Sequence, residues 1–299
     1  MSDPSLEWTL PAEGPSVVAI GGGHGLARSL GAIRRYASEV TAVVSVADDG
    51  GSSGRLRAML SIPAPGDIRR CLLALTPRPS LLADALEYRF DAGELEGHAL
   101  GNLLLAALTA TTGDFLGAVH TVGEMLGAIG TVLPATTVPV ELAGECADGR
   151  VVGQVRIMAS SRVTAIELVP SDVQAPSQVV EAIERADQIV IGPGSLYTSV
   201  LAALAPEGIV EALHASRARR VYVCNLREQI PETASYSIAD HVSALIAHEI
   251  VPDVVVADAR AILLGDVPRG VDVVETRLTS RQPLVHDEVL LAEALRSQL

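Results

Sequence analysis

The chain has 299 residues, 48% of them hydrophobic and only 3% aromatic, and a formal net charge of −14. This acidic balance excludes a general affinity for nucleic acid or anionic membranes, and no apolar run reaches the roughly 18 residues that a membrane span needs. All 22 basic residues are arginine, which excludes a P-loop lysine and Schiff-base chemistry. No positively charged, apolar leader occupies residues 1–15, so we expect a cytoplasmic protein.

The first half of the chain alternates strands and helices. Residues 1–15 are polar and rich in proline, which predicts a flexible N-terminal arm before a single α/β domain over residues 16–299. A strand at 17–20 leads through a glycine turn at 21–25 into a helix at 26–36, and a second strand follows at 40–47. This order is the first half of a dinucleotide-type unit. We then expect a loop at 50–54 and helices at 67–75, 103–110 and 116–129.

Between residues 131 and 160 the pattern changes. Hydrophobic residues alternate over 136–142 and 151–157, with an Asp-Gly turn signal between them, which predicts an antiparallel hairpin insertion. Afterwards we expect strands at 188–191, 220–225 and 254–257 and helices at 178–186, 196–204, 238–248 and 288–297. The predicted fold class is α/β, a Rossmann-like doubly wound and mostly parallel sheet of about six strands with a small antiparallel hairpin.

The first glycine turn lies where a phosphate-binding loop is expected, after an apolar strand and before a helix. Its candidate residues are Gly21, Gly22, Gly23, His24 and Gly25. Glycines allow close approach of the backbone to a phosphate, and a helix N-terminus offers unpaired N–H groups and a positive dipole end. The spacing does not match the G-x-G-x-x-G fingerprint, so an NAD(P) oxidoreductase is only a third hypothesis. A turn required by packing alone is the alternative.

Two adjacent carboxylates follow the second predicted strand. Mg²⁺ binds proteins through one or two carboxylates together with substrate phosphates, so Asp48 and Asp49 are candidate metal ligands. The glycines and hydroxyls that follow offer further groups for a phosphate. The alternative is a hydrogen-bonded turn in a solvated loop. The candidates in this segment are Asp48, Asp49, Gly50, Gly51, Ser52 and Ser53.

Three further segments add polar groups at predicted helix starts. Asp67 can cap its own helix, and Arg69 can bind a phosphate in two-point fashion. Asn102 can donate to and accept from a base or sugar, and Ser195 can cap a helix or contact a phosphate. No catalytic nucleophile is apparent, because no cysteine or serine lies in a nucleophile motif. The candidates are Gly66, Asp67, Arg69, Gly101, Asn102, Gly192, Gly194 and Ser195.

These motifs, read together, resemble those of the YvcK/CofD-like family, in its YvcK branch of gluconeogenesis factors. The matching stretches are GGGHG at 21–25, SVADDGGSSGRLR at 45–57, PGDIRRCLLAL at 65–75, GHALGNLLLAAL at 97–108 and GPGSLYTSV at 192–200. The resemblance implies a Rossmann-like fold and a cytoplasmic regulator of cell shape and of growth on gluconeogenic carbon sources. It also implies binding of UDP-sugars such as UDP-N-acetylglucosamine.

The related CofD branch implies an alternative, a Mg²⁺-dependent transferase that moves a phospholactate-type group onto a deazaflavin precursor. The segment DDGGSSG follows the YvcK branch rather than the transferase. After residue 225 that branch usually reads Q-P-G-E-T-D-G-Y, whereas here both glycines and the aspartate are replaced. Asn225, Gln229, Glu232 and Thr233 remain candidate ligand contacts. We expect a nucleotide or nucleotide-sugar partner and, from the frequency of symmetric oligomers, a homodimer.

Overall fold

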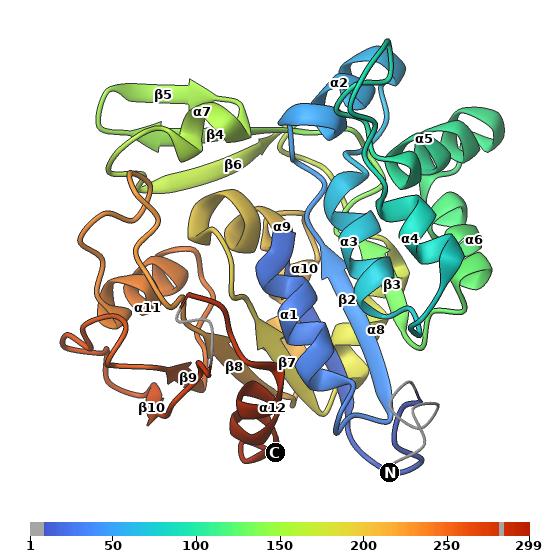
Figure 1. The fold of residues 1–299 in the computed structure, drawn as a ribbon. Helices are drawn as coiled ribbons and strands as arrows, with labels where there is room; N and C mark the ends of the chain where they lie inside the picture. The colour runs from blue at the N-terminus through green and yellow to red at the C-terminus, as the bar shows by residue number, and fades with distance from the viewer. Residues whose placement is uncertain (1–8, 281–283) are drawn as a thin grey trace.

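A computed structural model describes residues 9–280 and 284–299. Its main sheet has seven strands in the order β10-β9-β8-β7-β1-β2-β3, and every neighbouring pair is parallel (Figure 1). The predicted α/β fold with a mostly parallel sheet is therefore confirmed. The strands are β1 (Ser16–Gly21), β2 (Glu39–Val44), β3 (Thr131–Pro134), β7 (Gln188–Ile191), β8 (Arg219–Val223), β9 (Val254–Ala257) and β10 (Asp272–Glu275).

The strand order reverses between β1 and β7. From β1 the chain proceeds outward to β2 and β3, and from β7 it proceeds the other way to β8, β9 and β10. The core strands β7 and β9 are buried along their whole length, as expected for a parallel sheet covered on both faces. In open α/β sheets, ligands bind at the carboxyl ends of the strands, where the order reverses. In this fold, the expected ligand-binding crevice lies between the turns that follow β1 and β7.

Helices cover both faces of the sheet. On one face α1 (Gly23–Ile33) packs against α3 (Gly66–Ala74) and α12 (Glu288–Arg296), and on the other α8 (Ser177–Arg185) packs against α10 (Ile209–Ala215) (Figure 1). Because crossover connections between parallel strands are right-handed, the helices on the two sides of the reversal must lie on opposite faces of the sheet. The remaining helices are α2 (Gly51–Leu60), α4 (Leu81–Glu87), α5 (Leu100–Thr112), α6 (Phe115–Leu126), α7 (Gln154–Met158), a π-helix (Leu196–Leu201), α9 (Ala202–Leu204) and α11 (Ile238–Ala247).

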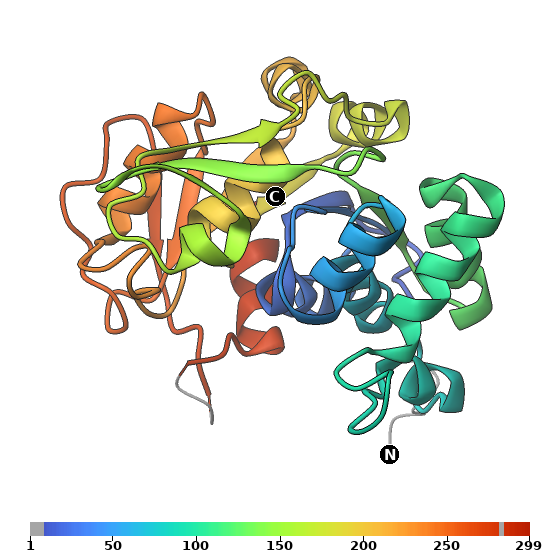
Figure 2. The ribbon, with the colours of Figure 1, turned by 90° about the horizontal axis from the view of Figure 1, so that it is seen from above.

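The insertion differs from its prediction in extent and content. It is a three-stranded antiparallel sheet of β4 (Glu141–Cys146), β5 (Gly149–Val152) and β6 (Ala165–Val169), in the order β5-β4-β6. Residues 131–134, predicted within the insertion, form the edge strand β3 of the main sheet. Half of the strand expected at 151–157 is instead helix α7. Seen from above, the insertion crosses the end of the main sheet where the strands' carboxyl ends lie (Figure 2).

The structure also differs from the sequence prediction at residues 50–54 and describes only part of the predicted N-terminal arm. The loop expected at 50–54 is in fact the first turn of α2. Gly54 must be glycine there, because an added Cβ would lie 1.9 Å from the backbone oxygen of Asp49. Of the predicted arm, residues 1–8 lie outside the described residues, and the carbonyl groups of Gly14 and Pro15 both accept hydrogen bonds from Ser38. Within the described part of the chain, no helix is long and apolar enough to span a membrane.

Candidate functional site

The first and third glycine turns touch each other at the reversal point. The Ser29 hydroxyl donates to the Gly192 carbonyl oxygen at 3.1 Å. An added Cβ on Gly25 would lie 2.2 Å from the Pro193 carbonyl oxygen, so only glycine permits this approach. Gly194 also lies near Gly22, although an added Cβ there would be 3.4 Å from the Gly22 carbonyl oxygen, an ordinary contact distance. The structure therefore brings the two predicted turns together, and part of their glycine content is required by packing.

The start of α3 is bound to the first glycine turn through Asp67. Its Oδ2 accepts a hydrogen bond of 2.6 Å from the backbone N–H of Gly23, and its Oδ1 pairs with Arg70. An added Cβ on Gly22 would lie 2.7 Å from the same carboxylate. Asp67 does not cap its own helix, whose N-cap is Pro65. Its carboxylate instead lies at the N-terminus of α1, where the helix dipole favours negative charge.

Among the candidate glycines of the site, two differ from the rest because open space faces them. Gly23 has a φ of +66° and Gly51 a φ of +47°, and an added Cβ on either would meet nothing within 4 Å. Both conformations lie in the left-handed region that favours glycine. Gly23 begins α1 and Gly51 begins α2, so each opens a helix at the carboxyl edge of the sheet. These two positions, rather than the packed glycines, are where a ligand can approach the backbone.

The two adjacent carboxylates face different partners. Asp48 Oδ1 accepts a hydrogen bond of 2.9 Å from Gly50, and Asp49 Oδ1 accepts one of 2.9 Å from Val155 at the start of α7. Burial raises the pKa of Asp48, and the neighbouring carboxylate of Asp67 raises it further. The close carboxylate partner of Asp48 is therefore Asp67, while Asp49 attaches the insertion to the edge of the sheet.

A series of buried side-chain hydrogen bonds connects Ser52, at the start of α2, to α3 and α5. Arg69 Nε donates to Asn102 Oδ1 at 2.9 Å, and Asn102 Nδ2 donates to the Ser52 hydroxyl at 3.1 Å. The Ser52 hydroxyl lies 3.0 Å from Nδ1 of His98. All four side chains are buried. His98 was not among the sequence candidates, although it lies in the quoted stretch at 97–108.

Close packing also explains the glycines of these helix starts. An added Cβ on Gly66 would lie 2.2 Å from the Ser53 hydroxyl oxygen, and one on Gly101 would lie 2.8 Å from Cδ of Arg69. Burial, together with the charges of Arg70 and Arg89, lowers the pKa of Arg69 to about 10. The helix starts therefore form one packed cluster with positive charge at its outer side.

On the other side of the reversal, the candidate side chains hydrogen-bond one another. Asn225 Oδ1 accepts from Gly194 N–H at 3.0 Å, and its Nδ2 donates back to the Gly194 carbonyl oxygen at 2.8 Å. Gln229 Nε2 donates to the Ser195 hydroxyl at 3.2 Å. The Thr233 hydroxyl accepts from the backbone N–H of Gln229 at 3.0 Å. These contacts fix the third glycine turn against the loop that follows β8.

Glu232 has a structural partner that the sequence did not indicate. Its side chain is only 2% exposed, and Oε1 accepts from the backbone N–H groups of Tyr197 and Thr198 at 2.8 and 3.2 Å. These groups open the π-helix at residues 196–201, which would otherwise leave N–H groups unpaired. Burial raises the pKa of Glu232. The carboxyl group therefore serves as a helix cap in this structure.

The buried thiols are unsuited to nucleophilic attack. Burial raises the pKa of Cys224 to about 12 and that of Cys71 well above its ordinary value, so thiolate is scarce at neutral pH. The Ser195 hydroxyl accepts from Gln229, a side chain that cannot act as a base.

A cavity opens directly beside the first glycine turn. It has a volume of about 520 Å³ and is lined by residues of α1 and α3 and of the segments flanking α4, His24 and Arg69 among them. Burial lowers the pKa of His24, as do the charges of Arg70, Arg69 and Arg28. The edge of the site is therefore electropositive although the chain as a whole is acidic.

Comparison with known proteins identifies the family. The sequence profile described as 2-phospho-L-lactate transferase CofD matches residues 17–293, nearly the whole chain. The chain belongs to the CofD family. Its resemblance to this family in the sequence motifs is thereby confirmed.

Relatives of this CofD-family chain include proteins named gluconeogenesis factor. The one from Halalkalibacterium halodurans is 46% identical over 247 residues, which cover 81% of this chain and 77% of that protein. The one from Bacillus subtilis is 45% identical over 237 residues, 78% and 75% of the two chains. A crystal structure of a UPF0052 family member from Bacillus halodurans superposes with a TM-score of 0.88 at 38% identity, covering 95% of this chain and 99% of that one.

Proposed function

We propose that this protein is a cytoplasmic regulator that binds a nucleotide-sugar, a UDP-sugar such as UDP-N-acetylglucosamine, without turning it over. In the cell it acts on cell shape and on growth on gluconeogenic carbon sources. The observation that carries the proposal is Gly23, which has a φ of +66° and open space above its backbone beside the crevice between β1 and β7. Relatives named gluconeogenesis factor at about 45% identity support the same choice.

The diphosphate of such a ligand would lie against the start of α1, beside the Asp67 carboxylate that already accepts from the Gly23 N–H, and would use the remaining N–H groups of the first turn. Helix N-termini bind phosphate through unpaired N–H groups and the positive end of the dipole. The electropositive cavity beside His24 adds a favourable field for a dianion. The base and sugar would lie toward the insertion, which crosses the same edge of the sheet. No nucleophile is required, because the proposed ligand is sensed and not converted.

Thermal unfolding with and without ligand tests this proposal. UDP-N-acetylglucosamine at about 100 times its Kd is expected to add about 2.7 kcal/mol to the free energy of unfolding, and UDP-glucose less or the same. Free UDP and N-acetylglucosamine serve as controls for the two halves of the ligand. If neither UDP-sugar changes the unfolding temperature at millimolar concentration, the proposal is wrong.

A second candidate function follows from Asp48 and Asp67. We propose as the alternative a Mg²⁺-dependent transferase of a phospholactate-type group, in agreement with the profile that matches the chain. Asp48 and Asp67 are neighbouring carboxylates at the phosphate-binding edge, and Mg²⁺ typically takes one or two carboxylates besides substrate phosphates. Residues 9–280 and 284–299 contain no cluster of three or more His, Cys, Asp or Glu residues suited to a metal. The ion, if bound, therefore needs the substrate's phosphates to complete its shell.

Replacing each adjacent carboxylate by its amide separates the two candidates. Asp48→Asn is expected to weaken Mg²⁺-dependent binding of GDP or a deazaflavin by at least about tenfold, because a carboxylate ligand is lost. Asp49→Asn is the matched control, since that carboxylate binds the N–H of Val155 instead. Calorimetric titration with and without Mg²⁺ measures both. Binding that is indifferent to Mg²⁺ in the unmodified protein rejects the transferase.

A further inference from the structure

Five of the 22 arginines line the single cavity between α1, α3 and the segments flanking α4. Only two carboxylates, those of Glu87 and Glu288, line the same cavity. Asp67 and Asp84 add two carboxylates through ion pairs with Arg70 and Arg78, so among the described residues the charge around the cavity is slightly positive in a chain whose net charge is −14. The arginines are Arg28, Arg69, Arg70, Arg78 and Arg89.

The charges in this cavity repel one another. Burial and the charges of Arg70 and Arg89 lower the pKa of Arg69 to about 10, against the opposing effect of the carboxylates of Glu87 and Asp67. Burial and the charges of Arg70, Arg69 and Arg28 lower the pKa of His24. An anion with more than one negative charge would relieve this repulsion, and planar guanidinium groups match phosphate oxygens in geometry.

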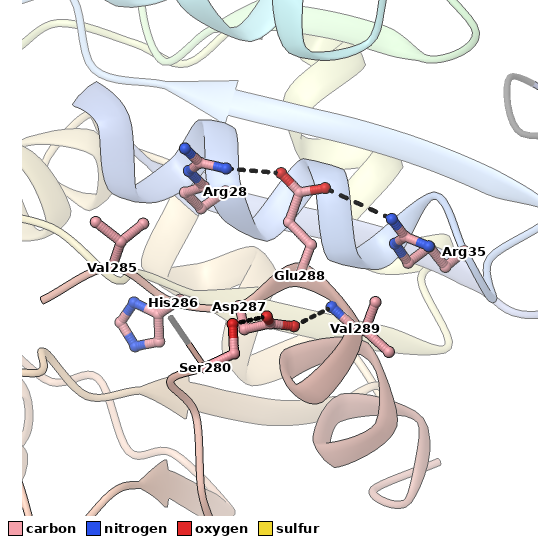
Figure 3. Close-up of a pocket in the computed structure, with 8 residues that line it drawn as sticks. All are labelled: Arg28, Arg35, Ser280, Val285, His286, Asp287, Glu288 and Val289. Atoms are coloured by element: carbon pink, nitrogen blue, oxygen red, sulfur yellow. Dashed lines mark hydrogen bonds and ion pairs between the residues drawn. The ribbon is translucent and has the colours of Figure 1, made fainter. Parts of the chain in front are cut away.

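Glu288 already occupies one side of the cavity as an internal anion. Its carboxylate lies between Arg28 of α1 and Arg35, which follows the end of that helix, at distances of 3.1 Å and 3.9 Å (Figure 3). The side chain of Glu288 is about a quarter exposed and that of Arg28 about half exposed. A contact between such exposed groups is weak and is readily exchanged for a better partner.

The sequence of α1 makes room for this carboxylate. An added Cβ on Gly31 would lie 2.5 Å from Cδ of Glu288 and 2.6 Å from its Oε1. Glycine in the middle of a helix is otherwise unfavourable. Gly31 is placed between Arg28 and Arg35, so the carboxylate can lie flat on the helix between them. The start of α12 is thereby attached to the wall of the cavity.

We propose that this cavity is a second anion site, which takes a small phosphorylated molecule carrying two or more negative charges, and that Glu288 competes with it for Arg28. The cavity shares His24 and Arg69 with the candidate nucleotide-sugar site, whereas Arg28, Arg78 and Glu288 belong to neither its glycine turns nor its carboxylate segment. Binding exchanges the Arg28–Glu288 ion pair for an Arg28–phosphate pair. The anion thus releases the start of α12 from α1.

Calorimetric titration of the whole chain with pyrophosphate at constant ionic strength tests the proposal. Arg28→Ala is expected to weaken binding by at least about tenfold, the loss of one charge-assisted contact between a guanidinium and a phosphate. Arg35→Ala is the matched control, because Arg35, just beyond the end of α1, contacts the same carboxylate but does not line the cavity. Its affinity should stay within about twofold of the unmodified protein.

Two variants test the competition with Glu288 by independent routes. Glu288→Gln removes the competing charge, and Gly31→Ala displaces the carboxylate by bulk without changing any charge. Each is expected to tighten pyrophosphate binding by roughly three- to tenfold. Equal affinities in the unmodified protein, Glu288→Gln and Gly31→Ala would overturn the competition.

The source of the phosphate and the place of binding are distinguished by two further titrations. Glycerol 3-phosphate represents a phosphate ester and pyrophosphate a free polyanion, and the tighter of the two identifies the class of ligand. Prior saturation with UDP-N-acetylglucosamine should leave pyrophosphate binding intact. Loss of pyrophosphate binding under that condition, or affinity that does not change in Arg28→Ala, would overturn a second site. The outcome does not depend on whether the nucleotide-sugar itself binds.

Discussion

The two sides of the reversal point differ in how their polar groups are satisfied. Beside β7 and β8, Asn225, Gln229 and Glu232 hydrogen-bond to the neighbouring turn and helix. Beside β1 and β2, two carboxylates face each other, and glycines with positive φ leave open space. The polar groups of the first side are already paired with one another, whereas the second side carries charged side chains and open helix starts that a ligand can contact. We infer that the β7–β8 side is the scaffold and the β1–β2 side the binding surface.

The largest expected effect on stability lies on the scaffold side. Glu232→Ala should lower the free energy of unfolding by about 3 kcal/mol, because two buried N–H groups lose their acceptor. Glu228→Ala, in the same loop, is the control: that carboxylate accepts one exposed hydrogen bond from Ser235, and its loss should cost less than about 0.5 kcal/mol. Urea unfolding measures both. Similar losses in the two variants would show that Glu232 is not a cap.

A pH dependence should also arise on the scaffold side, at His286. This side chain is buried and lies 3.2 Å from the Cys224 carbonyl oxygen at the end of β8, and burial lowers its pKa from 6.5 to about 4. Between pH 6.5 and 4 the imidazole is therefore protonated in the unfolded chain but neutral in the folded one. The free energy of unfolding falls as the pH falls through this window.

Between pH 7 and pH 5 the contribution of His286 is a loss of about 2 kcal/mol. His286→Gln keeps a donor for the Cys224 carbonyl but does not titrate, so its stability should fall less over the same interval. Unfolding by urea at the two pH values measures the difference between the proteins. Parallel losses in both would assign the pH dependence to other groups, such as the buried His241.

The smallest expected effect on stability is on the binding side. The raised pKa of Asp48 means that its ionised form is disfavoured in the folded state, so its contribution to stability is lost as pH rises through that pKa. Asp48→Asn removes this penalty and should leave the protein equally stable or more stable by roughly 1 kcal/mol at pH 7. A clear loss of stability would place Asp48 among the scaffold residues and weaken the comparison.

Much of the central sheet could be predicted because its strands are continuous apolar runs between glycine turns. The strands at β1, β2, β7, β8 and β9 follow this pattern. The edge strand β10 was not predicted, because it contains only two valines, with Asp272 before them and Glu275 after them. The edge strand β3 was assigned to the insertion, since four residues give no periodicity that separates the two sheets.

The site was predictable in its segments but not in its contacts. Sequence order indicated that the glycine turns gather at one edge, as they do. It could not tell the packed Gly25 from the open Gly23, because that difference depends on Pro193, far away in the chain. For the same reason Glu232 was expected at the ligand, although its partners are N–H groups of another segment. Residues with partners distant in sequence need the fold before their roles can be assigned.

The central claim is tested most directly by comparing two glycine variants for binding of UDP-N-acetylglucosamine. Gly23 has a φ of +66° and Gly113 a φ of +71°, and an added Cβ at either meets nothing within 4 Å. Both alanine variants should therefore lose a similar stability, about 1 kcal/mol. Gly113 is the C-cap of α5, whose first turn lies at the site. The length of the helix, roughly 18 Å, separates Gly113 from that first turn.

The account predicts that Gly23→Ala weakens the ligand by at least about tenfold in a calorimetric titration, while Gly113→Ala binds like the unmodified protein. Equal affinity in all three proteins would contradict binding at the first glycine turn.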